Sequence, residues 1–189
     1  LDRNPPELHN GKVTVHPKVG DYLKAMGEAG LIGTSFSFED GGQQLPEVVS
    51  SCLGFIVMAA NNGMMYTGLT SGAAGLINSF GSDELKQTYV SNMLSGKWQG
   101  TMALTEPQAG SSLSDITSTA TPQTDGSYLI KGQKVFISAG DHDQCENIIH
   151  LMLARIEGAP KGTKGISLFV VPKYRLDGAD NDVISTGVY

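Results

Sequence analysis

The sequence predicts an α+β protein in which a helical N-terminal domain precedes a β domain. In the first half, apolar residues recur with the 3.6-residue period of an α-helix. Beyond Gly100, short β-branched runs alternate with turn residues. The period changes between Gly96 and Gly100. We therefore expect an all-helical domain over residues 1–98 and an antiparallel β-barrel or β-sandwich domain over residues 99–189.

Start and stop signals place three helical segments in the first domain. Pro17 suits the first helical position, and Gly30 ends the first pattern. The second segment is divided in two by Asn61-Asn62-Gly63. Ser82 is a suitable N-cap for the third segment, which Gly96 closes. The expected helical segments are 18–29, 46–80 and 82–94, with a loop over 35–44.

Six strands are expected after the change of period. Each is a short run rich in β-branched or aromatic residues and bounded by turn residues. Asp125-Gly126 and Lys131-Gly132 are typical turn signals between such runs. The expected strands are 99–104, 116–121, 128–131, 134–138, 148–155 and 166–171.

Composition excludes several classes of protein. The net charge is −6 and there is no basic run, which disfavours nucleic-acid binding. The longest apolar run, residues 53–60, is too short for a transmembrane segment.

The two cysteines, Cys52 and Cys145, lie far apart in the sequence, so no disulfide framework is implied. A reducing, cytoplasmic location fits this pattern. Cys52 sits in an apolar helical run, where we expect it to be buried.

Two short segments carry the functional signal. The first is Met102-Ala103-Leu104-Thr105-Glu106-Pro107-Gln108-Ala109-Gly110-Ser111-Ser112, and the second is Phe136-Ile137-Ser138-Ala139-Gly140. In order and separation they resemble the two flavin-contacting segments of the acyl-CoA dehydrogenase family. The sequence departs from the family pattern at Ser112, where many members have Asp, and at Met102, where some have Tyr. The resemblance extends over nearly the whole chain, and residues 132–173 are most similar to the long bacterial members.

The residue types suit a flavin. Gly110 and Ser111 offer backbone N–H groups for an oxyanion, and Thr105 and Ser138 offer hydroxyls. Phe136 offers a flat apolar face for the ring. The resemblance implies FAD contacts from eight residues and places Ser111 also on the acyl-CoA side. The eight are Met102, Leu104, Thr105, Gly110, Ser111, Phe136, Ile137 and Ser138.

The resemblance also implies a reaction and its partners. Family members oxidise an acyl-CoA thioester to the trans-2-enoyl-CoA: a carboxylate base removes the α-proton, and hydride passes to flavin N5. The base is a Glu of a C-terminal helical domain, and we expect the chain to stop at Tyr189 before the middle β domain is complete. We therefore name no catalytic residue and expect the fragment alone to be inactive. An electron-transferring flavoprotein or other acceptor, and a homo-oligomer of the full-length protein, are also implied.

Other functions remain alternatives. The same scaffold could serve as a non-catalytic protein that binds acyl-CoA or a partner. His142, Cys145 and His150 match no usual zinc spacing, so we expect no metal. Glu106, just before Pro107, resembles a catalytic base, but we expect it to fix the loop through hydrogen bonds to nearby backbone. No Lys follows Gly110 as a P-loop requires, and no Gly-rich βαβ fingerprint is present.

Overall fold

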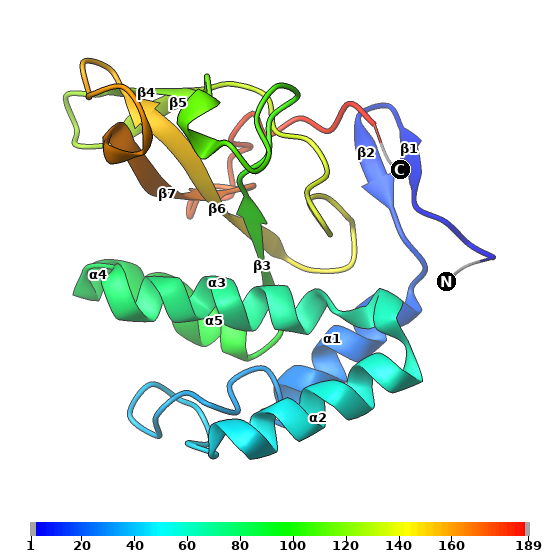
Figure 1. Ribbon diagram of the computed structural model, residues 1–189. Coiled ribbons are helices and arrows are strands. Elements are labelled where there is room, and N and C mark those ends of the chain that lie inside the picture. Colours follow the sequence, from blue (N-terminus) through cyan, green and yellow to red (C-terminus); the bar gives the residue numbers. More distant parts are fainter. Residues whose placement is uncertain (1–2, 188–189) are drawn as a thin grey trace.

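The computed structural model describes residues 3–187, which form a layer of helices beneath a curled β-sheet (Figure 1). The helices occupy the first half of the chain and the large sheet the second half, so the predicted α+β class is confirmed. The elements are β1 (Glu7–His9), β2 (Lys12–Thr14), α1 (Lys18–Glu28), α2 (Glu47–Ala60), η1 (Asn62–Met64), α3 (Tyr66–Phe80), α4 (Asp83–Leu85), η2 (Lys86–Val90), α5 (Ser91–Leu94), β3 (Trp98–Ala103), η3 (Leu113–Asp115), β4 (Thr119–Pro122), β5 (Tyr128–Lys131), β6 (Asn147–Ile156), η4 (Thr163–Gly165) and β7 (Ile166–Pro172).

The predicted helix boundaries are confirmed by local contacts. Gly30 follows the C-cap of α1 and has a φ of 68°, a left-handed conformation that glycine adopts without strain. Asn61 breaks the second segment, and its side chain accepts the N–H of Gly63 at 2.9 Å. Ser82 caps the next segment by accepting the N–H of Leu85 at 3.3 Å. That segment continues through α4, the π-helical turn η2 and α5.

The sheet is mixed, so the prediction of an antiparallel domain is wrong. The strand order is β3-β6-β4-β5, and β7 pairs with β6. β6 runs parallel to β3 and to β4, whereas β4/β5 and β6/β7 are antiparallel. The antiparallel pairs are joined by short connections. The long connection from β3 to β6 lets those two strands run in the same direction.

Two further expectations about strands are corrected by the structure. The N-terminal domain is not all-helical, because β1 and β2 form a hairpin around Asn10-Gly11, with φ values of 51° and 74°. Such left-handed pairs favour two-residue hairpin turns. The strand expected at 134–138 is absent. Phe136 has a φ of 57°, which is incompatible with a pleated strand.

The core lies between the helices and one face of the sheet. A Cβ on Gly100 of β3 would meet Ala73 Cβ at 2.6 Å and Met93 Cε at 2.7 Å, so α3 and α5 approach the strand closely because it carries glycine there. The buried residues of this cluster come from the helices, the 32–36 segment and β6. They are Ile32, Phe36, Ala73, Ala74, Ile77, Tyr89, Val90, Met93, Leu94, Ile149 and Leu151.

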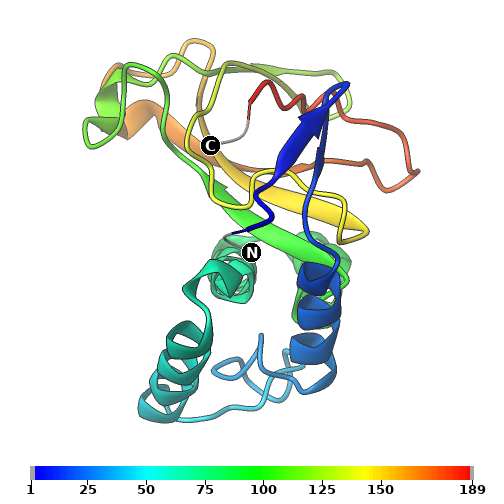
Figure 2. The ribbon, with the colours of Figure 1, turned by 90° about the vertical axis from the view of Figure 1, so that its right-hand side faces the viewer.

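Helix α2 lies farthest from the sheet (Figure 2) and buries none of its side chains. Cys52 is exposed, so the expectation that it is buried is wrong. The α2 side chains that are large, apolar and exposed are Val48, Val49, Phe55, Ile56 and Met58. Within residues 3–187, no helix has both the length and the apolar character needed to cross a membrane.

Candidate functional site

The two predicted segments lie next to each other in space. The first segment begins with the last two residues of β3, and the second follows β5. Two hydrogen bonds join the first segment to residues 134 and 135, directly before the second. The Val135 N–H donates to the Thr105 carbonyl at 3.0 Å. Lys134 Nζ donates to the Leu104 carbonyl at 3.1 Å. These bonds place Leu104 and Thr105 beside the chain that enters Phe136.

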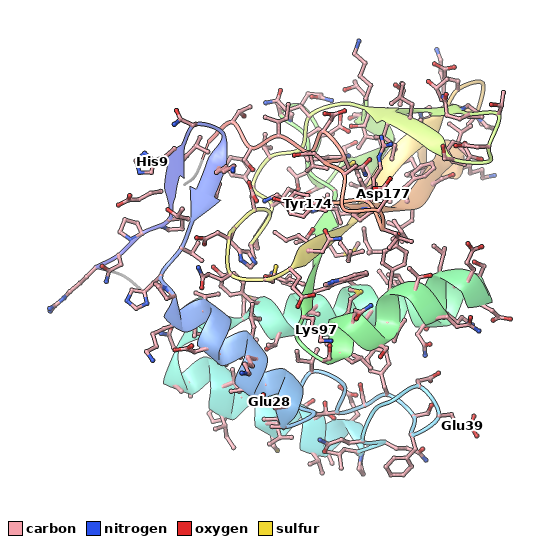
Figure 3. All side chains as sticks on the ribbon, turned by 180° about the vertical axis from the view of Figure 1, so that it is seen from behind. His9, Glu28, Glu39, Lys97, Tyr174 and Asp177 are labelled. Carbon is pink, nitrogen blue, oxygen red and sulfur yellow. The ribbon has the colours of Figure 1, made fainter. Side chains whose placement is uncertain are left out.

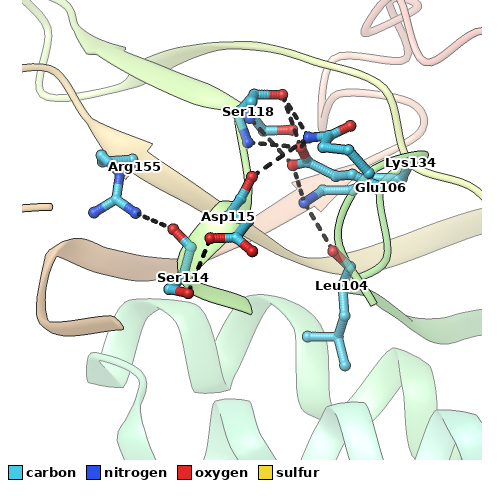
Figure 4. Close-up of polar contacts among 9 residues, drawn as sticks. Leu104, Glu106, Ser114, Asp115, Ser118, Lys134 and Arg155 are labelled. Atoms are coloured by element: carbon cyan, nitrogen blue, oxygen red, sulfur yellow. Dashed lines mark hydrogen bonds and ion pairs between the residues drawn. The ribbon is translucent and has the colours of Figure 1, made fainter. Parts of the chain in front are cut away.

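A buried carboxylate stands at this junction (Figure 4). Glu106 Oε1 lies 2.8 Å from Lys134 Nζ, and the two side chains are 1% and 7% exposed. Burial opposes ionisation of Glu106, but hydrogen bonds from Lys134, Ser118 and Thr117 outweigh it and hold the carboxyl pKa below its usual range. The expectation that Glu106 fixes the loop is confirmed, because it accepts the backbone N–H groups of Thr117 and Ser118.

Lys134 was missed in the sequence analysis. The sequence indicates Lys134 only indirectly. A buried carboxylate needs a cation or several hydrogen-bond donors, and Lys134 is a cation two residues before the second segment. Sequence spacing alone does not reveal which lysine reaches Glu106.

The second segment borders an open cavity. The cavity has a volume of about 1660 Å³, larger than a typical small-ligand pocket. Phe136, Ile137 and Ser138 line it, as do His150 and Met152 of β6. The Phe136 side chain is 77% exposed, and its left-handed backbone is uncommon for a bulky residue. Strained backbone of this kind concentrates at functional sites.

Not every predicted residue joins this cavity. Of the eight, only Phe136, Ile137 and Ser138 line it. Leu104 and Thr105 are half-buried, and Gly110 and Ser111 are exposed, but none of these four lines the cavity. The Met102 side chain packs against the core cluster on the helical side of the sheet. The hydrogen bonds made by residues 134 and 135 place Leu104 and Thr105 beside the second segment, outside the cavity lining. A cofactor role for all eight residues stays a prediction.

The chemistry of the available donors fits a flavin. The hydroxyls of Thr105, Ser111 and Ser138 make no hydrogen bond to any other described residue. The backbone N–H groups of Gly110 and Ser111 donate to no acceptor within residues 3–187. Open hydroxyls and amides suit the polar edge and phosphates of FAD, and the exposed Phe136 ring suits its apolar face.

The histidines and cysteine considered as metal ligands occupy the interior of the sheet domain. Cys145 Sγ lies 3.8 Å from His142 Nε2, and His150 Nδ1 lies 2.7 Å from Thr101 Oγ1. Within the described part of the chain, no three His, Cys, Asp or Glu side chains are placed to hold a metal. Burial lowers the pKa of both histidines to about 4 and raises the pKa of the Cys145 thiol to about 12.

Family models match almost the whole chain. The model described as "Acyl-CoA dehydrogenase, N-terminal domain" matches residues 7–97. The model described as "Acyl-CoA dehydrogenase, middle domain" matches residues 101–181.

Individual proteins agree with the family models. A 3-methylmercaptopropionyl-CoA dehydrogenase of Ruegeria pomeroyi is 43% identical over 173 residues, covering 91% of this chain and 29% of the relative. A broad-specificity linear acyl-CoA dehydrogenase of Mycobacterium tuberculosis is 39% identical over 197 residues, covering 99% of this chain and 32% of the relative. The chain thus spans about a third of these relatives' length. A Bacillus anthracis acyl-CoA dehydrogenase complexed with FAD has a TM-score of 0.70 at 28% identity, covering 82% of this chain and 26% of that one. This chain belongs to the acyl-CoA dehydrogenase family.

Proposed function

We propose that this chain carries the cofactor side of the active site of an FAD-dependent acyl-CoA dehydrogenase. The whole enzyme would oxidise an acyl-CoA thioester to the trans-2-enoyl-CoA. The observation that carries the proposal is the junction of the two segments. There the Val135 N–H and the Lys134 ammonium bind the Thr105 and Leu104 carbonyls, next to the exposed Phe136 ring.

Each segment has a separate task in this proposal. Phe136 lies against the flavin ring, and the hydroxyls of Thr105 and Ser138 bind its polar edge. The amides of Gly110 and Ser111 bind an anionic group, and Ser111 also faces the acyl-CoA. Met102, Leu104 and Ile137 complete the contacts. FAD, when bound, accepts the β-hydrogen of the substrate as hydride at flavin N5.

The proposal assigns no catalytic base to the described residues. Glu106 is the acid nearest the junction, but its two oxygens already accept five hydrogen bonds. A general base must reach the proton that it removes. We assign removal of the α-proton to a carboxylate in the part of the whole protein that corresponds to the rest of its longer relatives. The 189-residue chain alone is then expected to be inactive.

The whole protein would pass its electrons to an electron-transferring flavoprotein or another acceptor. We also propose that it is cytoplasmic and forms a homo-oligomer. The exposed apolar side chains of α2 support assembly, because apolar surface of this kind marks interaction sites.

A matched pair of variants of the whole protein tests the flavin site. Phe136 and Phe38 are 77% and 70% exposed, but Phe38 lies in the loop between α1 and α2. We expect Phe136→Ala to weaken FAD binding by about tenfold or more, and Phe38→Ala to leave it unchanged. Titration with FAD, followed by flavin fluorescence, gives both affinities. Equal affinities in the two variants would contradict the assignment of Phe136. A wild-type protein that binds acyl-CoA without FAD would instead favour the non-catalytic alternative.

A further inference from the structure

Glu106 and Lys134 form a buried cross-link between three stretches of the chain. Glu106 Oε1 accepts hydrogen bonds from Lys134 Nζ at 2.8 Å and from the Ser118 N–H at 3.1 Å. Glu106 Oε2 accepts the Thr117 N–H at 2.7 Å, the Thr117 hydroxyl at 2.9 Å and Gln108 Nε2 at 2.8 Å. The carboxylate therefore ties the first segment to the chain before β4 and to the approach to the second segment.

Lys134 extends the cross-link to the main chain of the first segment. Besides Glu106 it binds the Leu104 carbonyl at 3.1 Å, and the adjacent Val135 N–H binds the Thr105 carbonyl at 3.0 Å. Residues 104–106 and 134–135 are thus joined by three hydrogen bonds. Phe136 follows directly and takes its left-handed conformation at that point. The position of the Phe136 ring relative to Thr105 depends on this junction.

Stability alone does not account for such a pair. Removing two charges from water carries a large cost, and well-packed apolar residues often replace a buried ion pair without loss of stability. An ion pair does, however, impose a defined geometry, because both groups must satisfy their hydrogen bonds in one arrangement. Binding sites need their contacts held within a fraction of an ångström by supporting side chains.

We propose that Glu106 and Lys134 are positioning residues for the flavin site. They act by setting the spacing between the first segment and Phe136–Ser138. Lys134 belongs to the cavity lining, but its side chain is only 7% exposed, and its ammonium donates to Glu106 and the Leu104 carbonyl. The inference rests on the proposed function, because it assumes that these segments bind FAD.

The test uses three variants of the full-length protein. Lys134→Met breaks the pair. The double variant Glu106→Gln with Lys134→Met removes both charges, so that it folds even where the single variant does not. Asn147→Ala is the control, because Asn147 is also buried and also makes hydrogen bonds to the main chain, with Tyr174 and Ile148. Asn147 is the first residue of β6 and pairs with Trp98, the first residue of β3. Ala103, in the first segment, pairs with Met152 at the other end of the β3/β6 pairing.

The measurements are FAD affinity, the visible circular dichroism of bound flavin, and thermal unfolding without FAD. We expect both variants at the pair to weaken FAD binding by about tenfold or more and to change the flavin dichroism. Asn147→Ala should change only the unfolding temperature.

Wild-type FAD affinity and dichroism in the double variant would overturn the positioning role and leave the proposed function intact. An equal loss of FAD in Asn147→Ala would also overturn the positioning role, because the effect would then follow general stability. A wild-type protein that binds no FAD would overturn both proposals.

Discussion

Mild acid should destabilise this protein through two buried histidines, His142 and His150. His142 is 2% exposed and His150 is 3% exposed. For His142, burial lowers the pKa to about 4, with Asp141 and Asp143 opposing the shift and Lys173 adding to it. For His150, burial again dominates and the pKa is about 4, with Asp141 opposing and Lys173 adding. The Gln144 N–H donates to His142 Nδ1 at 3.1 Å. Protonation of Nδ1 would replace this acceptor with a second N–H donor that faces the Gln144 N–H.

The sign and the size of the effect follow from linkage. The unfolded state, with a histidine pKa of about 6.5, binds these protons before the native state does, so stability falls as pH drops from about 6.5 to about 4. At about pH 5, each histidine costs about 2 kcal/mol relative to about pH 7.5, or about 4 kcal/mol together. Total stabilities are about 5–15 kcal/mol, so the loss is large. The lowered pKa of Glu106 contributes stability that is lost only as pH falls below the ordinary carboxyl range, so it affects the result little at about pH 5.

Urea unfolding at the two pH values measures this loss. His142→Gln and His150→Gln should each remove about half of the pH dependence, although each variant is less stable at neutral pH. His9 lies exposed on the hairpin at the edge of the molecule (Figure 3), and His9→Gln is the matched control. A wild-type protein that is equally stable at both pH values would show that these histidines do not destabilise the fold in acid. The full pH dependence in a protein carrying both His142→Gln and His150→Gln would show the same.

Two further predictions concern glycine packing and thiol reactivity. Gly100→Ala should destabilise the protein by about 1–3 kcal/mol in thermal unfolding, because its Cβ would meet Ala73 Cβ at 2.6 Å. Gly54→Ala on α2 meets nothing within 4 Å and should be neutral or stabilising; an equal loss in both variants would contradict the packing argument. Iodoacetamide near neutral pH should label exposed Cys52 and spare Cys145, whose thiol pKa burial raises to about 12. Peptide mass spectrometry measures both sites, and rapid labelling of Cys145 in the folded protein would count against its burial.

The sequence predicted the helices and most strands because their ends carry strong local signals. Gly30 and Ser82 act as caps in the structure just as their residue types indicate. Strand direction has no such signal, since a period of two is the same in parallel and antiparallel pairs. The hairpin at Asn10-Gly11 was readable from that dipeptide alone.

The candidate site was predicted less completely than the fold. Residues 134–138 have the β-branched and aromatic composition of a strand, but the left-handed backbone of Phe136 removes them from the sheet. The partnership of Glu106 with Lys134 is a tertiary contact across 28 positions, which neither motif reveals. The two motifs identified the family. The structure adds the contacts that join them.

The proposed role of the junction, as the cofactor side of an acyl-CoA dehydrogenase site, can be tested in one experiment. Acyl-CoA is added anaerobically to the full-length protein loaded with FAD, and the visible absorbance of the flavin is followed. We expect bound flavin that bleaches as enoyl-CoA forms, with both flavin binding and bleaching weakened in Phe136→Ala. A protein that holds no flavin, or holds flavin that stays oxidised with every acyl-CoA tried, would contradict it.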